Sequence, residues 1–208
     1  MLTAKLVLLL IGGVVTAVGG VGAVIWGPYT KARRRLHAGS TRLEDRAIVT
    51  LTGVVRALGE PLVAPLSGKP CVACRSFASW VPDRRVGGDR GGALAHTDAQ
   101  PFELVTDEGP VIVDGALDFA IRPAAVVPCK LERQARFLAM HGQSVEFMQR
   151  AGFEEILIAP GDRISVQGMV MIEASPVGGE RGFRDTAVAI RLVPHDDHPL
   201  TIGEPRRR

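Results

Sequence analysis

Two cysteines three residues apart are the side chains of this sequence with the clearest chemical potential. Cys71 and Cys74 form a C-x-x-C motif, which occurs as half of a zinc site or as a redox-active dithiol. No second C-x-x-C follows, and the motif does not open a helix after a strand as it does in thioredoxin-like proteins. In an extended strand, residues i and i+3 point to opposite faces, so the two thiols should not meet. The pattern therefore favours two buried structural cysteines.

The segment VPHDDHP (193–199) gathers two histidines and two aspartates. His195 and His198 flank Asp196 and Asp197, and imidazole and carboxylate groups are ligands for divalent cations. Two prolines bracket the segment, however, and no further ligand is identifiable nearby. A solvated polar turn between two strands is therefore the preferred interpretation, and we expect no metal and no cofactor.

Other groups that catalyse reactions in enzymes stand without partners. His96 and His141 have no titratable neighbour in sequence that suggests a role, and no G-x-S-x-G nucleophile motif occurs. Glu154 and Glu155 begin a strand-like run, where alternation sends one carboxylate inward and the other outward. We therefore assign no catalytic residue.

Runs of β-branched and alternating apolar residues predict a mainly β (α+β) domain. They cover 47–55, 71–81, 101–115, 154–174, 187–193 and 199–203. In the clearest run the apolar face consists of Ile164, Val166, Gly168, Val170 and Ile172. About seven short strands separated by turns favour a partly closed barrel or a sandwich.

One or two short helices and one long loop interrupt these strands. Leu131, Ala135, Leu138 and Ala139 have helical spacing, and Gly142 is placed to end that helix. A second short helix is predicted over 144–150, with a serine at its start. Residues 82–98 contain four glycines and several charges, which predicts a mobile hairpin loop that forms the variable surface of the domain.

The N-terminal segment has the length and flanks of a transmembrane helix. Leu6 to Trp26 is twenty-one residues without a formal charge, which spans about 30 Å as a helix, the thickness of a hydrocarbon core. The run is longer than the apolar region of a cleaved signal peptide. KARRR (31–35) follows, and this excess of basic residues after the helix places the domain in the cytoplasm, with the periplasm as the alternative.

Gly12, Thr16 and Gly20 recur every four residues within the predicted span. Small residues at this spacing let two membrane helices approach closely, which offers a route to self-association. Glycine is also generally frequent in membrane helices, and this simpler interpretation is preferred.

The chain divides by composition into an anchor with its basic flank (1–37), a polar connector (38–46), a β-rich domain (47–204) and a basic tail (205–208). Eight of the 25 basic residues lie in the anchor and the tail, where no acid accompanies them. The rest of the chain holds 17 basic against 22 acidic residues. This sign opposes binding of a phosphate backbone, so nucleic acid is not an expected partner.

Four segments in a fixed order resemble a known family: TLTGVVRALGEPLVAPLSGKPCVACR (50–75), FELVTDEGPVIVD (102–114), EEILIAPGDRISVQGMV (154–170) and PLTIGE (199–204). The soluble part is similar to the "beside a membrane" (BAM) domain of the GIDE family, the membrane-anchored E3 ubiquitin ligases of mitochondria and their bacterial relatives. The positions that match its motifs are Pro65, Leu66, Gly68, Cys71, Arg75, Glu155, Gly161, Asp162 and Gly168.

The resemblance implies a membrane-tethered, β-rich module, OB-like in its later strands, that acts through protein or ligand contacts next to the bilayer. Ligase chemistry in the family resides in a RING finger beyond a second transmembrane helix, and this sequence shows neither feature. We therefore expect a single-pass protein of the cell membrane with a non-catalytic interaction or ligand-binding domain. The alternative hypotheses are an enzyme of the ligase family and a thiol-dependent activity at Cys71 and Cys74.

Overall fold

Strands dominate the structure, with one short helix among them. The computed structural model describes residues 32, 33, 36, 42–80, 92–125, 130–144, 146, 151–174, 188–195 and 199–205. Within these ranges no helix has both the length and the apolarity that a bilayer crossing needs. The predicted span 6–26, with its small-residue face at Gly12, Thr16 and Gly20, lies outside the described residues and stays a prediction.

Five strands close into a barrel. In spatial order they are β1 (Ile48–Ala57), β6 (Phe102–Thr106), β7 (Gly109–Val113), β12 (Val188–Val193) and β11 (Arg163–Ala174), and β11 pairs again with β1. Every neighbouring pair is antiparallel except β7 and β12, which run parallel. If the five barrel strands are numbered by their order along the chain, their order around the barrel is 1-2-3-5-4. The predicted β-rich fold is confirmed, in its barrel form.

Alternation of apolar residues builds the barrel core. Val49, Leu51 and Val55 of β1 are buried together with the inward residues of the other barrel strands. On β11 the predicted face is buried as far as Val170, but Ile172 is 43% exposed. The expectation for Ile172 was wrong because β11 runs past the end of β1, where it pairs with β12 alone.

Two further strands widen the barrel sheet. β13 (Leu200–Gly203) pairs with β11, and β8 (Leu117–Ala120) pairs in parallel with β13. Leu200 packs against the backbone of Gly168 so closely that a Cβ at this glycine would collide with its side chain. The glycine at position 168 is thus a packing requirement of the barrel.

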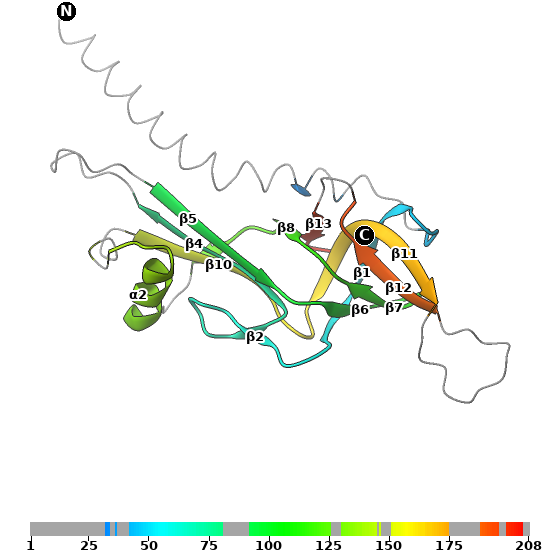
Figure 1. The fold of residues 1–208 in the computed structure, drawn as a ribbon, viewed down its shortest axis with the longest axis horizontal. Coiled ribbons are helices and arrows are strands. Elements are labelled where there is room, and N and C mark those ends of the chain that lie inside the picture. The colour runs from blue at the N-terminus through cyan, green and yellow to red at the C-terminus, as the bar shows by residue number, and fades with distance from the viewer. Residues whose placement is uncertain are drawn as a thin grey trace, which may run out of the picture.

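A second sheet has the order β5 (Gly92–Ala99), β4 (Ala73–Trp80), β10 (Ala151–Ile158) and β9 (Ala124–Ala125). Its strands belong to two insertions into the barrel, one between β1 and β6 and the other between β7 and β11. Figure 1 shows this sheet at one end of the long axis of the molecule and the barrel at the other. The main hydrophobic core continues from the barrel into the near end of this sheet, through Phe77, Ile156 and Ile158.

Strand β5 corrects the loop predicted over 82–98. Residues 92–98 belong to β5, which pairs with the whole length of β4. Gly92 lies under the ring of Trp80, its partner in the ladder, so the position requires the residue without a side chain. Long-range pairing has overridden a glycine-rich composition here. The remainder of the predicted loop lies outside the described residues.

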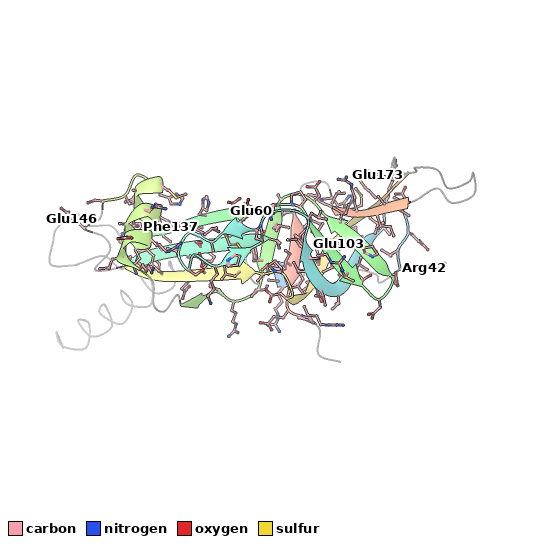
Figure 2. The ribbon with its side chains drawn as sticks, turned by 90° about the horizontal axis from the view of Figure 1, so that it is seen from below. Arg42, Glu60, Glu103, Phe137, Glu146 and Glu173 are labelled. Atoms are coloured by element: carbon pink, nitrogen blue, oxygen red, sulfur yellow. The ribbon has the colours of Figure 1, made fainter. Side chains whose placement is uncertain are left out.

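The helix α2 (Leu131–Met140) agrees with the sequence prediction in its bounds. Its buried residues are Phe137 and Leu138, which pack on the second sheet, and Figure 2 labels Phe137 at the base of the helix next to the strands. Leu131, by contrast, is exposed. Gly142 has a φ of +67° and follows the helix end as expected. Of the second predicted helix only residues 144 and 146 are described.

Residues of the predicted basic flank contact the domain. Ala32 and Leu36 are buried against Ala120 of β8, and Leu36 also fills the space beside Gly203. The Thr50 hydroxyl donates a hydrogen bond of 3.1 Å to the Leu36 carbonyl oxygen. The flank is therefore packed onto the barrel at these residues.

The end of the predicted polar connector is also held by the barrel. Arg46 N–H donates to the Val170 carbonyl at 2.8 Å, and the Asp45 carboxylate accepts the N–H of Ile172 at 3.1 Å. Both contacts run along β11, so the chain is fixed to the barrel before β1 begins.

Candidate functional site

The segment with the most specific motif matches folds as a tight turn on a two-stranded ribbon. The ribbon consists of β2 (Leu62–Val63) and β3 (Pro70–Cys71). Gly68 N–H donates to the Ala64 carbonyl at 2.9 Å, and Gly68 has a φ of +71°, a conformation that glycine adopts without strain. Gly68 also lies against the guanidinium of Arg133 from α2. Pro65 is half-buried within this turn.

A buried carboxylate anchors this turn to the second sheet. Glu155 of β10 is only 5% exposed. Its Oε1 accepts the Leu66 N–H at 3.1 Å and the Ser76 hydroxyl at 2.7 Å, while its Oε2 accepts the Ser67 N–H at 3.1 Å. These donors come from the turn and from β4, so one side chain joins three elements. Because its oxygens are occupied by protein donors, Glu155 acts as a structural anchor.

Cys71 and Cys74 share one small pocket, which corrects the prediction that they face apart. Both are free thiols and essentially fully buried, and they pack together with Ala64. The intervening residues Val72 and Ala73 both lie in the main core instead of alternating. The chain bends at Val72 between β3 (Pro70–Cys71) and β4 (Ala73–Trp80), so strand alternation does not continue from Cys71 to Cys74.

A hydrogen bond between the two thiols shifts their pKa values in opposite directions. The Cys74 S–H donates a hydrogen bond to the sulfur of Cys71, and this bond lowers the pKa of Cys71 below its ordinary value. The same bond, followed by burial, raises the pKa of Cys74. The carboxylates of Glu155 and Asp98 act in the raising direction on both thiols. Cys71 is therefore the thiol that loses its proton first.

An open cleft lies where the second sheet meets the barrel sheet. It has a volume of about 540 Å³ and is lined by Arg75 of β4, residues 97–99 of β5 and residues 115–118 at the start of β8. Arg75 brings a positive charge to this cleft, and Asp98 and Asp118 bring negative charges. Such a lining suits a polar ligand that carries both hydrogen-bond acceptors and donors.

The side chain of Arg75 stacks on an aromatic ring of the same strand. Its guanidinium carbon lies 5.2 Å from the centre of the Phe77 ring, a cation–π contact. Its Nε is buried, and no described atom accepts a hydrogen bond from it. A buried donor without an acceptor is costly.

The remaining motif positions have structural roles away from the cleft. Gly161, with a φ of +94°, and Asp162 form the turn between β10 and β11. This turn docks on β1, since Gly161 N–H donates to the Val55 carbonyl and Val55 N–H donates to the Asp162 carbonyl, both at 2.9 Å. The structure thus gathers Pro65, Leu66 and Gly68 in the turn that Glu155 anchors, and Cys71 lies in the ribbon that carries this turn. The other motif positions, Arg75, Gly161, Asp162 and Gly168, lie elsewhere.

His96 and His141 meet, although 45 residues separate them in sequence. Their ring centres are 5.7 Å apart in an edge-to-face arrangement, and His141 also contacts Phe137 at 5.0 Å. No local signal reveals this pair, because the pairing of β5 and the docking of α2 create it. The described part of the chain holds no group of three or more metal-ligating side chains. Cys129 and residues 196–198 of the histidine–aspartate turn lie outside the described residues.

Comparison with known proteins adds nothing to this geometry. No protein-family model, no curated protein and no solved structure matches the chain.

Proposed function

We propose that this protein is a non-catalytic binding module of the BAM type, held beside a membrane by residues 6–26, and that the cleft at Arg75 is its ligand site. The observation that carries the proposal is the open cleft of about 540 Å³ with charges of both signs on its lining. Concave sites with a few convergent polar groups are the usual form of ligand sites. The sequence resemblance to the GIDE family supports the tethered, BAM-type part of the proposal.

The order of the barrel strands supports an OB-like assignment. A five-stranded Greek-key barrel is the basis of the OB-fold, and ligands bind there on the second and third strands and at the loops after the first and fourth strands. In this chain the connection after the first barrel strand, β1, is the insertion that carries β4 and β5. Arg75 and Asp98 thus belong to the connection that contributes to binding in such barrels.

The charge pattern indicates which ligands the cleft accepts. The guanidinium of Arg75 binds a carboxylate or a carbonyl oxygen, while Asp98 offers acceptor oxygens to an ammonium or an amide N–H. A peptide segment of a partner protein and a small polar molecule both have this combination. The acidic balance of residues 38–204 opposes nucleic acid.

Site-directed photocrosslinking in intact cells tests this proposal. A photoreactive residue at Thr97, exposed on the cleft lining, is expected to form a defined adduct that the Arg75→Met variant loses. The control position is Glu108, exposed in the turn between β6 and β7. The control variant is Arg56→Met, which removes an exposed arginine from the barrel. Equal adducts from both positions, or adducts that survive Arg75→Met, would contradict the cleft as the ligand site.

Protease accessibility tests the membrane orientation. Digestion of the domain in inverted vesicles but not in spheroplasts is expected for a cytoplasmic domain. The reverse pattern would place it in the periplasm, and digestion in neither preparation would contradict an exposed, tethered domain.

A further inference from the structure

The pocket that holds Cys71 and Cys74 is separate from the proposed ligand site. It is formed by Ala64 and the two cysteines, with Leu62 and Leu157 packed against them. These aliphatic neighbours offer no metal ligand, and the described residues around the pair contain no larger cluster of ligating side chains. A closed structural zinc site needs four ligands, so the surroundings do not favour one.

We propose that Cys71 and Cys74 are a redox-active dithiol that forms a reversible intrachain disulfide. The bend at Val72, between β3 and β4, leaves both thiols in the same pocket, while Val72 and Ala73 lie in the main core. A disulfide forms without backbone rearrangement only when both side chains already lie close together, and the packing of both cysteines in one buried cluster favours this. The proposal does not depend on the function of the cleft.

The backbone at the Val72 bend is held by hydrogen bonds to neighbouring segments. Val72 N–H donates to the Ile158 carbonyl at 2.8 Å, and Gln100 N–H donates to the Val72 carbonyl at 3.0 Å. Val72 is therefore bonded on both sides, to the strand β10 and to the residue after β5. Because Val72 is fixed by these hydrogen bonds, the side chains of Cys71 and Cys74, on either side of Val72 and Ala73, are fixed on the same side of the chain.

The two cysteines differ in how strongly their backbone is held. Cys74 lies within β4, which pairs with β10 on one side and with β5 on the other. Cys71 ends the two-residue strand β3, whose only ladder partner among the described strands is the equally short β2. Val63 of this ribbon is 66% exposed. Short exposed ribbons open locally at low free energy, so a small reagent reaches Cys71 first.

The chemistry follows from this asymmetry when the oxidant is a hydroperoxide. The Cys71 thiolate, favoured by the hydrogen bond from Cys74, attacks one peroxide oxygen, the O–O bond breaks, and water leaves after protonation. Cys71 is then a sulfenic acid. Cys74 Sγ attacks Cys71 Sγ, the S–O bond breaks, and a second water carries away the proton of Cys74. Two thiols and one hydrogen peroxide thus give one disulfide and two waters, and a dithiol such as dithiothreitol reverses the oxidation.

The test uses the folded full-length chain in nonionic detergent, with hydrogen peroxide as the probe. The Cys129→Ser background leaves only the two cysteines of the pair. Both free thiols are expected to disappear with the loss of two hydrogens from the intact mass, and peptide mapping is expected to find a Cys71–Cys74 crosslink. Dithiothreitol is expected to restore both thiols.

Two variants separate the roles of the thiols. Cys74→Ser is expected to stop at a sulfenic acid on position 71 that dimedone traps. Cys71→Ser is expected to remain unmodified, because the remaining thiol is held within the sheet. Near-ultraviolet circular dichroism of each variant confirms that it is folded, and the unsubstituted pair tests the proposal even where a variant fails to fold.

Three outcomes would overturn the proposal. The first is retention of both thiols while peroxide consumes added glutathione in the same tube. The second is oxidation only in urea, which would show that the fold prevents the reaction. The third is irreversible sulfinic acid at position 71 without a crosslink.

Discussion

Replacing Glu155 by glutamine tests the anchor between the turn and the second sheet. The glutamine carbonyl can take the place of Oε1 and keep the hydrogen bonds from Leu66 N–H and the Ser76 hydroxyl. The glutamine amide then replaces Oε2, and its N–H groups face the N–H of Ser67. One buried acceptor is lost, and two charge-assisted hydrogen bonds become neutral.

The expected loss in the free energy of unfolding is the sum of the changes in these three hydrogen bonds. An unsatisfied donor costs about 1–3 kcal/mol, and neutral hydrogen bonds are about half as strong as charge-assisted ones. Part of this loss is recovered because a buried charge is removed. We therefore expect Glu155→Gln to lower the free energy of unfolding by about 3 kcal/mol, and the midpoint of thermal unfolding by about 6–12 °C.

Urea unfolding of the full-length chain in nonionic detergent measures this change. Trp80 is 8% exposed in β4, and a Trp26→Phe background makes it the only tryptophan. The matched control is Glu154→Gln, the same substitution at the adjacent half-buried position, with an expected effect within about 0.5 kcal/mol. If the free energies of unfolding of the two variants lie within about 0.5 kcal/mol of each other, Glu155 does not anchor the turn as described.

Two further predictions concern the thiol pair and the packed flank. In a background without the third cysteine, the thiolate absorbance of Cys71 is expected to appear at lower pH than in the Cys74→Ala variant, because the hydrogen bond lowers the pKa of Cys71 and stabilises its charged form. Equal titration of the two proteins would contradict the role of that hydrogen bond. Gly203→Ala is expected to displace Leu36 and to increase hydrogen exchange at residues 32, 33 and 36, whereas Gly59→Ala, with open space around its Cβ, is the neutral control. Unchanged exchange in Gly203→Ala would show that Leu36 is not held there.

Local sequence patterns predicted most of the barrel because its strands follow simple alternation. The turn at Asp107 and the end of the helix at Gly142 could also be predicted from the sequence, since each depends on the conformational preferences of a few adjacent residues. Strand β5 could not be predicted from the sequence, because it is rich in alanine and polar residues and forms through pairing with β4. Strand propensity depends strongly on such context.

The candidate sites depended even more on long-range packing. Alternation predicted opposite faces for Cys71 and Cys74, but the chain bends at Val72 and the core buries both residues between them. The cleft at Arg75 joins residues from three separate stretches of chain, which no local pattern connects. The resemblance identified Glu155 as a position of interest, and only the structure supplies its partners.

Ala32 and Leu36 pack against the barrel. This contact would limit the distance between the domain and a membrane that holds the N-terminal segment. If residues 6–26 span a bilayer as the sequence predicts, Ala32, the first docked side chain, lies six positions beyond Trp26. A fully extended chain of that length covers about 20 Å, and a helical one about 9 Å. The domain would then stay within this distance of the headgroups, with a restricted orientation. Its effective concentration toward partners in the same membrane would be high, and partners farther from the surface would have to approach it.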